Sequence, residues 1–252
     1  IRIFIFGING KMGRFVCDQA ENSNDFVVTG GFDRVPHPTI RTYSDVTEVP
    51  NDFDVVVDFS RAEVLPQVIA LCEKYSKPAV LASTGYSDEQ LAAIAKLSEK
   101  VAVLRSGNMS VGVNLLLDLV EKAAKTLGYS FDAEIVEKHH NQKADAPSGT
   151  ALMLADKIKE VRPETEFVYG KNFIYGREGM VGARDKKEIG IHAVRGGTIV
   201  GEHDVIFAGE DEIITLSHVA LSRKIFAVGA LKAAAFIVTK KNGLYTMKNA
   251  LD

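Results

Sequence analysis

The side chains best suited to chemistry lie within residues 134–152. His139, His140 and Lys143 lie close together, and Ser148-Gly149-Thr150 follows where a run with helical spacing begins. An imidazole titrates near neutral pH and can therefore hold or pass on a proton. The first N–H groups of a helix have no partner inside the helix, so they favour a carboxylate or a phosphate. The segment predicts a site that binds a small anion and transfers a proton.

Each of these residues also has a simpler interpretation. A lone His at a strand end is more often structural or solvated, and a lone Lys is usually solvated. Neighbouring residues of a strand point to opposite faces, so at most one of His139 and His140 faces a given pocket. A two-His metal site lacks a third ligand at a recognisable spacing, and we therefore expect no bound metal. A second motif, at the N-terminus, favours the catalytic interpretation.

This second motif follows an apolar run at residues 1–6 that is typical of a strand buried on both faces. Its residues are Gly7-Ile8-Asn9-Gly10-Lys11-Met12-Gly13, which lead into a predicted helix through about residue 20. Glycines in such a loop permit a tight turn and let the backbone approach a pyrophosphate. The spacing differs from the commoner G-x-G-x-x-G, so the motif alone is equally consistent with a simple strand-to-helix turn.

A predicted strand at residues 26–31 strengthens the nucleotide interpretation, because it leads to Asp33 and Arg34. An acid at this distance from the glycines can accept hydrogen bonds from the adenosine ribose. Arg34 can instead meet a 2′-phosphate. An ordinary charged loop is the alternative. We expect the protein to use either NADH or NADPH.

The elements that must position these residues repeat a strand-helix theme. Strands are predicted at 54–59, 78–81 and 101–104, with helices at 60–75 and 87–98. Ser60 and Glu63 have capping-box spacing for the first of these helices, and Pro66 must lie in or near its first turn. This alternation predicts an α/β fold with a doubly wound parallel sheet of the Rossmann type.

Ligands of open parallel sheets bind outside the carboxyl ends of the strands. Two small polar loops lie at such ends and are therefore predicted cofactor contacts, although simple turns would have the same composition. The loops are Ala82-Ser83-Thr84 and Ser106-Gly107-Asn108-Met109.

The pattern changes after Met109, which predicts a second domain of the α+β class. Residues 111–127 form one amphipathic helix, a strand at 131–136 and the His/Lys segment follow, and strands are predicted at 189–195, 199–208 and 212–219. A final Ala-rich helix at 226–238 is expected to pack on the first domain. We therefore assign 1–109 plus 221–252 to dinucleotide binding and 110–220 to substrate binding and oligomerisation.

Other charged residues of the second domain are predicted to have ordinary roles. Arg195 has a possible pocket role, but a solvated hairpin is the favoured interpretation, and His192, His203 and His218 are treated as structural. Residues 161–187 are glycine-rich and charged, and they are interpreted as either a lid or a connection between subunits.

Composition limits the partners and the compartment. The 252 residues carry a formal net charge of −3, which gives no reason to expect nucleic acid or an anionic membrane as a partner. No apolar run is long enough to span a bilayer. Cys17 and Cys72 fall in separate predicted helices, so a disulfide framework is not expected. The chain opens on a strand, so no signal peptide is expected, and we predict a cytoplasmic location.

These motifs together resemble the dihydrodipicolinate reductase family over essentially the whole chain. The most specific match is Glu137-Lys138-His139-His140-Asn141-Gln142-Lys143-Ala144-Asp145-Ala146-Pro147-Ser148-Gly149-Thr150-Ala151. Further similar segments are the glycine motif at residues 7–13, Gly201-Glu202-His203 and Gly243-Leu244-Tyr245-Thr246-Met247. The chain departs from the family's frequent pattern at Ala82-Ser83-Thr84, where Gly-Thr-Thr is common, and at Ser106-Gly107-Asn108-Met109.

The resemblance implies hydride transfer from NADH or NADPH to a cyclic unsaturated imine dicarboxylate, giving tetrahydrodipicolinate for lysine and diaminopimelate biosynthesis. It implies that His139 and Lys143 are the acid/base residues. Of the two, we prefer Lys143 as the final proton donor, with His139 orienting or relaying. The resemblance also implies that His140 and the amides of Gly149 and Thr150 hold the substrate carboxylates. A homotetramer and closure of the two domains over the ligands are further implications.

Two alternatives belong to other classes. A regulatory sensor built on the same first domain would bind NAD(H) without turnover, and the His/Lys loop argues against it. A semialdehyde or homoserine dehydrogenase could share the first domain. The former would need a Cys nucleophile in the second domain, where this sequence has none.

Overall fold

The first apolar run forms the centre of a parallel sheet. In the computed structural model, which describes residues 1–162 and 172–251, β1 (Arg2–Phe6) pairs in parallel with β2 (Val27–Phe32) and with β4 (Val55–Asp58). Residues 3–6 are fully buried, as expected for a strand covered on both faces. The strand order is β12-β6-β5-β4-β1-β2-β3, with every neighbouring pair parallel. The other strands are β3 (Thr42–Tyr43), β5 (Ala79–Leu81), β6 (Ala102–Arg105) and β12 (Gly243–Tyr245).

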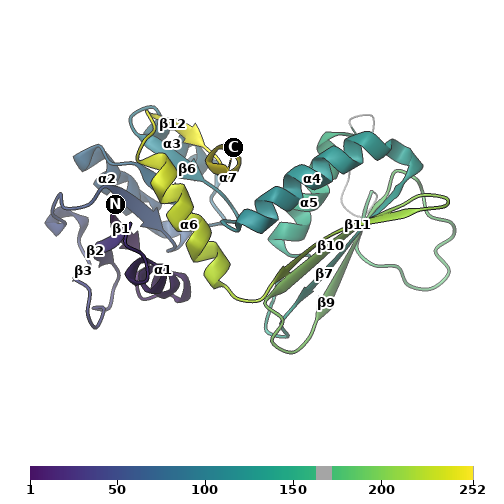
Figure 1. The fold of residues 1–252 in the computed structure, drawn as a ribbon, viewed down its shortest axis with the longest axis horizontal. Coiled ribbons are helices and arrows are strands. Elements are labelled where there is room, and N and C mark those ends of the chain that lie inside the picture. The colour runs from purple at the N-terminus through teal and green to yellow at the C-terminus, as the bar shows by residue number, and fades with distance from the viewer. Residues whose placement is uncertain (163–171, 252) are drawn as a thin grey trace. The chain divides into compact units, whose positions relative to one another are not determined.

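Helices cover both faces of this sheet (Figure 1), and each face has its own apolar cluster. Side chains of α1, α6 and α7 pack on one face, and those of α2 and α3 pack on the other. This arrangement confirms the predicted doubly wound α/β fold. The helices are α1 (Lys11–Glu21), α2 (Leu65–Tyr75), α3 (Asp88–Ser98), α6 (Lys224–Ile237) and α7 (Met247–Leu251). Short 3-10 turns are η1 (Val46–Glu48) and η2 (Ala62–Val64).

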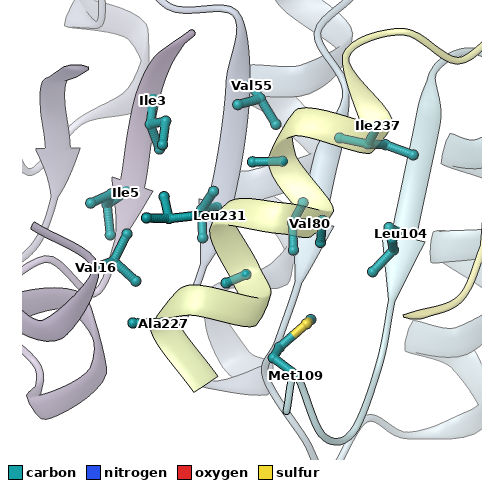
Figure 2. Close-up of a cluster of buried hydrophobic side chains, with 14 of the residues drawn as sticks. Ile3, Ile5, Val16, Val55, Val80, Leu104, Met109, Ala227, Leu231 and Ile237 are labelled. Carbon is teal, nitrogen blue, oxygen red and sulfur yellow. The ribbon is translucent and has the colours of Figure 1, made fainter. Parts of the chain in front are cut away.

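Helix α6 confirms the prediction that the chain returns to the first sheet. Figure 2 shows its Ala227 and Leu231 within the cluster that contains Ile3 and Val80 of the sheet. Gly229 permits this close packing, because a Cβ at that position would lie 1.7 Å from the carbonyl oxygen of Met109.

The start of α2 differs from its prediction. Ser60 and Glu63 do not form a capping box, because η2 precedes the helix and the hydroxyl of Ser60 bonds to the buried carboxylate of Asp58. Pro66 does lie in the first turn, as predicted. The capping box of this unit belongs instead to α3, where the hydroxyl of Ser87 accepts from the Gln90 N–H and the Gln90 side chain accepts from the Ser87 N–H.

The second sheet mixes parallel and antiparallel pairs in the order β11-β10-β7-β9-β8. Strand β7 (Asp132–His139) lies at its centre, antiparallel to β10 (Gly201–Ala208) and parallel to β9 (Ile189–Arg195). Its alternate residues are buried, as the alternating sequence predicts. The other strands are β8 (Phe173–Ile174) and β11 (Ile213–Ala220).

Two helices cover one face of the second sheet. Helices α4 (Val111–Leu127) and α5 (Gly149–Glu160) contribute apolar residues to a shared cluster with β7, β9 and β10, and Lys157 of α5 bonds to Glu121 of α4 at 3.3 Å. The short turn η3 (Gly128–Ser130) joins α4 to β7. Over the described part of the chain, no helix is long and apolar enough to cross a bilayer.

Contacts among the described residues divide the chain into two compact units, 1–111 with 223–252 and 112–222. The segment interpreted as a lid or a subunit connection, 161–187, falls partly outside the described residues, which omit 163–171. Its described part is tied to its own sheet, because Arg177 and Arg184 both bond to Glu134 of β7.

Candidate functional site

The end of β7 presents His139 on the same face as Glu137, because alternate residues of a strand share a face. The His139 side chain is 11% exposed, and Glu137 is fully buried. The Oε2 atom of Glu137 lies 2.6 Å from Nδ1 of His139. His140 follows the strand and is half-buried.

Glu137 accepts hydrogen bonds through both carboxylate oxygens. Arg195 donates from Nη1 to Oε2 and from Nη2 to Oε1, each at 2.7 Å, and the backbone N–H of Ser148 donates to Oε1 at 3.0 Å. Burial alone would raise the pKa of Glu137, but hydrogen bonds from Arg195, His139 and Ser148 outweigh burial and lower it. Glu137 is therefore a carboxylate at neutral pH.

His139 is held neutral beside this carboxylate. Burial lowers the pKa of His139, opposed by its hydrogen bond to Glu137 and the Glu137 charge, while the positive charges of Lys143 and Arg195 add to the lowering. An ionised carboxylate only accepts hydrogen bonds, so Nδ1 of His139 must carry the proton. The Nε2 atom then has a lone pair, which suits a group that accepts or relays a proton.

The start of α5 is held by the same cluster. Ser148 is its N-cap, and its hydroxyl accepts from the Ala151 N–H at 3.2 Å while lying 3.1 Å from Nε2 of His203. The hydroxyl and the His203 imidazole therefore share a hydrogen bond whose direction follows the tautomer of His203. Gly149 is exposed and has open space around it. The start of α5 is therefore suited to an anion that approaches the backbone at Gly149.

Lys143 lies in the loop between β7 and α5. Its Nζ contacts Asp145 at 2.8 Å, and its backbone N–H donates to the carbonyl of His140 at 3.1 Å. The second unit thus brings His139, His140, Lys143 and the Gly149-Thr150 helix start to one end of β7.

The favoured interpretation of the sequence placed neither Arg195 nor Glu137 in this cluster. The prediction that Arg195 is a solvated hairpin residue is wrong, because its guanidinium forms a two-pronged ion pair with Glu137. His203, which was interpreted as structural, is 4% exposed and contacts Ser148, the N-cap of α5. The contact of Glu137 with His139 could have been predicted, because an acid two residues before a histidine on the same strand lies on the same face.

The first unit carries a separate cavity of about 430 Å³ beyond the glycine motif. Gly7 has a φ of 75°, and a Cβ on Gly13 would lie 2.2 Å from the Gly7 carbonyl oxygen, so the turn requires both glycines. Lining residues predicted from the sequence are Gly7, Asn9, Gly10, Asp33 and Arg34; those not predicted are Phe32, Phe59, Ser60, Arg61 and Val64. The helix start beside this cavity is suited to a pyrophosphate.

Asp33 shapes the far side of the glycine turn. Its carboxylate accepts from the backbone N–H of Asn9 at 3.0 Å and from that of Arg34 at 2.7 Å. A carboxylate has further lone pairs, so Asp33 can still accept from a ribose hydroxyl. The acid, the cation and the glycine turn therefore fit an adenosine ribose with or without a 2′-phosphate.

The remaining predicted cofactor residues lie outside the lining of this cavity. Lys11 and Met12 begin α1, whereas Ile8 and Met109 are buried in the core, which leaves only their backbone atoms for a ligand. The loops after β5 and β6 contain the others, namely Ala82, Ser83, Thr84, Ser106, Gly107 and Asn108.

No group of three or more His, Cys, Asp or Glu residues within 1–162 and 172–251 is arranged to hold a metal ion.

Comparison with known proteins places the whole chain. A family model described as dihydrodipicolinate reductase, N-terminus, matches residues 1–109, and one described as dihydrodipicolinate reductase, C-terminus, matches 112–251. The 4-hydroxy-tetrahydrodipicolinate reductase of Caldanaerobacter subterraneus subsp. tengcongensis is 51% identical, with 99% of this chain and 97% of the relative covered. The enzyme of that name from Clostridium botulinum is 48% identical, with 100% and 98% covered.

A solved structure agrees with these matches. The dipicolinate-bound dihydrodipicolinate reductase from Paenisporosarcina sp. TG-14 superposes with a TM-score of 0.79 at 26% identity, covering 100% of this chain and 99% of that one. The matches span both units and the residues that build both sites. This chain therefore belongs to the dihydrodipicolinate reductase family.

Proposed function

We propose that the protein reduces 4-hydroxy-tetrahydrodipicolinate with NADH or NADPH, as a step of lysine biosynthesis. The observation that carries this proposal is the cluster at the end of β7. One buried carboxylate, Glu137, contacts both the imidazole of His139 and the N-terminal residue of the anion-binding helix. A site with these parts suits a small dicarboxylate that must receive a proton. The relatives' names give the same reaction.

The substrate's carboxylates are held by His140 and by the N–H groups of Gly149 and Thr150. Gly149 supports this role because a Cβ built there would meet no described residue within 4 Å apart from its own chain neighbours and helix backbone, so a ligand can approach the backbone. The bound dipicolinate of the Paenisporosarcina relative is a planar dicarboxylate, which is the chemical class that such amides would hold.

The dinucleotide is held by residues 7–12, by Asp33 and Arg34, and by the loops after β5 and β6. Its reduced nicotinamide supplies a hydride to the substrate. Asp33 accepts from an adenosine ribose, and Arg34 meets a 2′-phosphate when the nucleotide carries one. Unit 1–111 with 223–252 thus binds the nucleotide, and unit 112–222 binds the substrate.

The carbon next to the one that receives the hydride must then gain a proton. Lys143 donates it from Nζ, and His139 orients Lys143 or relays the replacement proton through its Nε2 atom. The 4-hydroxyl of the substrate leaves as water, which gives the cyclic unsaturated imine. The hydride and the proton then add two hydrogens to that ring and yield tetrahydrodipicolinate. The two acid/base residues are therefore distinct from the groups that hold the carboxylates.

The active assembly is a homotetramer formed through the second unit, which light scattering of the active enzyme would test: a stable, fully active monomer would remove this part. The free, buried thiols of Cys17 and Cys72 fit a reducing compartment, and we place the enzyme in the cytoplasm.

The reaction is tested by following the loss of NADH or NADPH absorbance while a synthase makes the labile substrate in place from pyruvate and aspartate semialdehyde. Oxidation that requires every component supports the reductase and ranks the two nucleotides. Nucleotide binding without oxidation, with a working synthase, would favour a sensor that binds NAD(H) without turnover.

A further inference from the structure

Glu137 bonds not only to an arginine, as a buried ion-pair residue does, but also to His139 and to the backbone of Ser148. It is fully buried, and each carboxylate oxygen accepts one bond from Arg195 and one from an element of the site. Oε2 contacts the His139 imidazole, and Oε1 contacts the Ser148 N–H at the start of α5. The guanidinium supplies charge, whereas the other two contacts fix geometry.

We propose that Glu137 is a positioning residue that holds His139 in its Nδ1–H tautomer and, through the same carboxylate, fixes the start of the carboxylate-binding helix α5. This inference rests on the proposed function. His139 and the amides of Gly149 and Thr150 belong to segments separated by the Lys143 loop. The Glu137 carboxylate bonds to both segments. It therefore fixes the position of the His139 imidazole relative to the backbone N–H groups that bind the substrate.

The neighbours of His139 leave little room for another arrangement. Arg195 lies opposite His139 in the parallel register of β7 and β9, so its guanidinium reaches Glu137 from the adjacent strand. Gly201 lies on the other side, where a Cβ would be 3.1 Å from Nε2 of His139. The ring of His203 meets that of His139 edge-on, with centroids 5.2 Å apart. The imidazole is therefore packed as well as hydrogen-bonded.

The chain contains a matched comparison in Glu134, which lies on the opposite face of β7. Glu134 also bonds to arginines, Arg177 and Arg184, and to a histidine, His192, whose Nε2 lies 2.7 Å from Oε2. It resembles Glu137 in chemistry, but its partners do not include the Lys143 loop or the start of α5. Glu134→Gln thus removes a similar carboxylate without touching the site.

The first measurement is the ¹⁵N NMR spectrum of the histidine rings in the unliganded full-length enzyme near pH 7.5, with His139 identified by the signals lost in His139→Gln. We expect the Nδ1–H tautomer in the unsubstituted protein. In Glu137→Gln the amide NH₂ meets an N–H donor, so the ring should shift toward the Nε2–H tautomer. An Nε2–H ring in the unsubstituted protein would overturn the inference even if Glu137→Gln does not fold.

Kinetics then separate positioning from structural support. Glu137→Gln is expected to lower kcat on the order of 100-fold and to raise KM for the substrate, with KM for the nucleotide unchanged. Glu134→Gln should keep kcat within about twofold per folded molecule. Equal losses in both variants, or a loss without a tautomer change, would overturn the positioning role. If the unsubstituted enzyme showed no substrate-dependent oxidation, the proposed function would fail while the tautomer result would stand.

Discussion

The carboxylate of Glu137 and the imidazole of His139 lie 2.6 Å apart, two positions apart on the same face of β7. This pair makes the titration of the second unit unusual, because it keeps an ionised acid next to a neutral imidazole in a buried setting. The ring of His203 packs edge-on against that of His139, and burial is the main cause that lowers the pKa of His203.

Stability should fall as the pH drops through the histidine range. Burial is the main cause that lowers the pKa of His203 to about 4, and the charge that a protonated His139 would carry adds to the lowering, while the negative charge of Glu137 opposes it. His203 in the unfolded chain has a pKa of about 6.5. Between that pH and about 4, it is therefore protonated in the unfolded chain but neutral in the folded protein. The contribution of His203 is therefore fully present above about pH 6.5 and is lost as the pH falls toward 4, by on the order of 1 kcal/mol per pH unit.

Urea titrations of the free energy of unfolding between pH 7.5 and 4.5 measure this effect. Carboxylates with lowered pKa values, such as that of Glu134 at about 2, lose their contribution to the free energy of unfolding mainly below pH 4.5. They therefore change little over the pH range of this titration. His203→Gln keeps a polar partner for Ser148, because an amide both donates and accepts, and should flatten the curve, whereas His192→Gln, at a side chain that is 32% exposed, should change it less. A His203→Gln curve as steep as that of the unsubstituted protein would contradict the assignment.

Gly149→Ala should weaken substrate binding without harming the fold. A Cβ at Gly149 meets no atom within 4 Å, and Ala favours the helix, so stability should be unchanged or rise by about 0.5 kcal/mol. The added methyl would lie where we place the substrate carboxylate. KM and the dissociation constant for dipicolinate should rise roughly tenfold, which corresponds to one lost hydrogen bond. Gly196→Ala, equally open, is the control; unchanged dipicolinate binding in Gly149→Ala would remove the carboxylate site from α5.

Arg34→Ala should separate the two nucleotides. Arg34 lines the cavity beside Asp33, and its charge matters only when a 2′-phosphate is present. We expect KM for NADPH to rise roughly 10- to 100-fold, the range of a lost charge-assisted hydrogen bond, and KM for NADH to change little. Arg41→Ala, whose guanidinium lies over the Tyr43 ring, serves as the control. Equal changes for both nucleotides would show that Arg34 does not read the phosphate.

Much of this architecture was predictable because its signals are local. The apolar run of β1, the alternation in β7 and the Ser148 cap before α5 each depend on neighbouring residues. The strand β12 was not predicted, since three residues form it only by pairing with β6, far away in the chain.

The predicted site was incomplete for the same physical reason. Arg195 reaches Glu137 through the parallel pairing of β7 with β9, whose register no local pattern encodes. Ser60 was expected to cap a helix, but the helical segment begins one residue later, with Arg61 as the N-cap of η2, and the Ser60 hydroxyl bonds to the buried side chain of Asp58. Sequence patterns therefore located the chemical groups, while long-range pairing decided which of them meet.

The most direct test of the account is the turnover of Lys143→Ala beside that of Lys138→Ala. Lys138 precedes His139 on β7, so the two side chains point to opposite faces of the sheet. The Lys138 ammonium bonds to Glu202 and Asp204. We predict that Lys143→Ala loses roughly 10²- to 10⁴-fold in kcat, the usual contribution of a general acid, while NADH binding and the Lys138→Ala kcat stay unchanged. Turnover by Lys143→Ala at the unsubstituted rate would contradict the assignment of Lys143 as the proton donor.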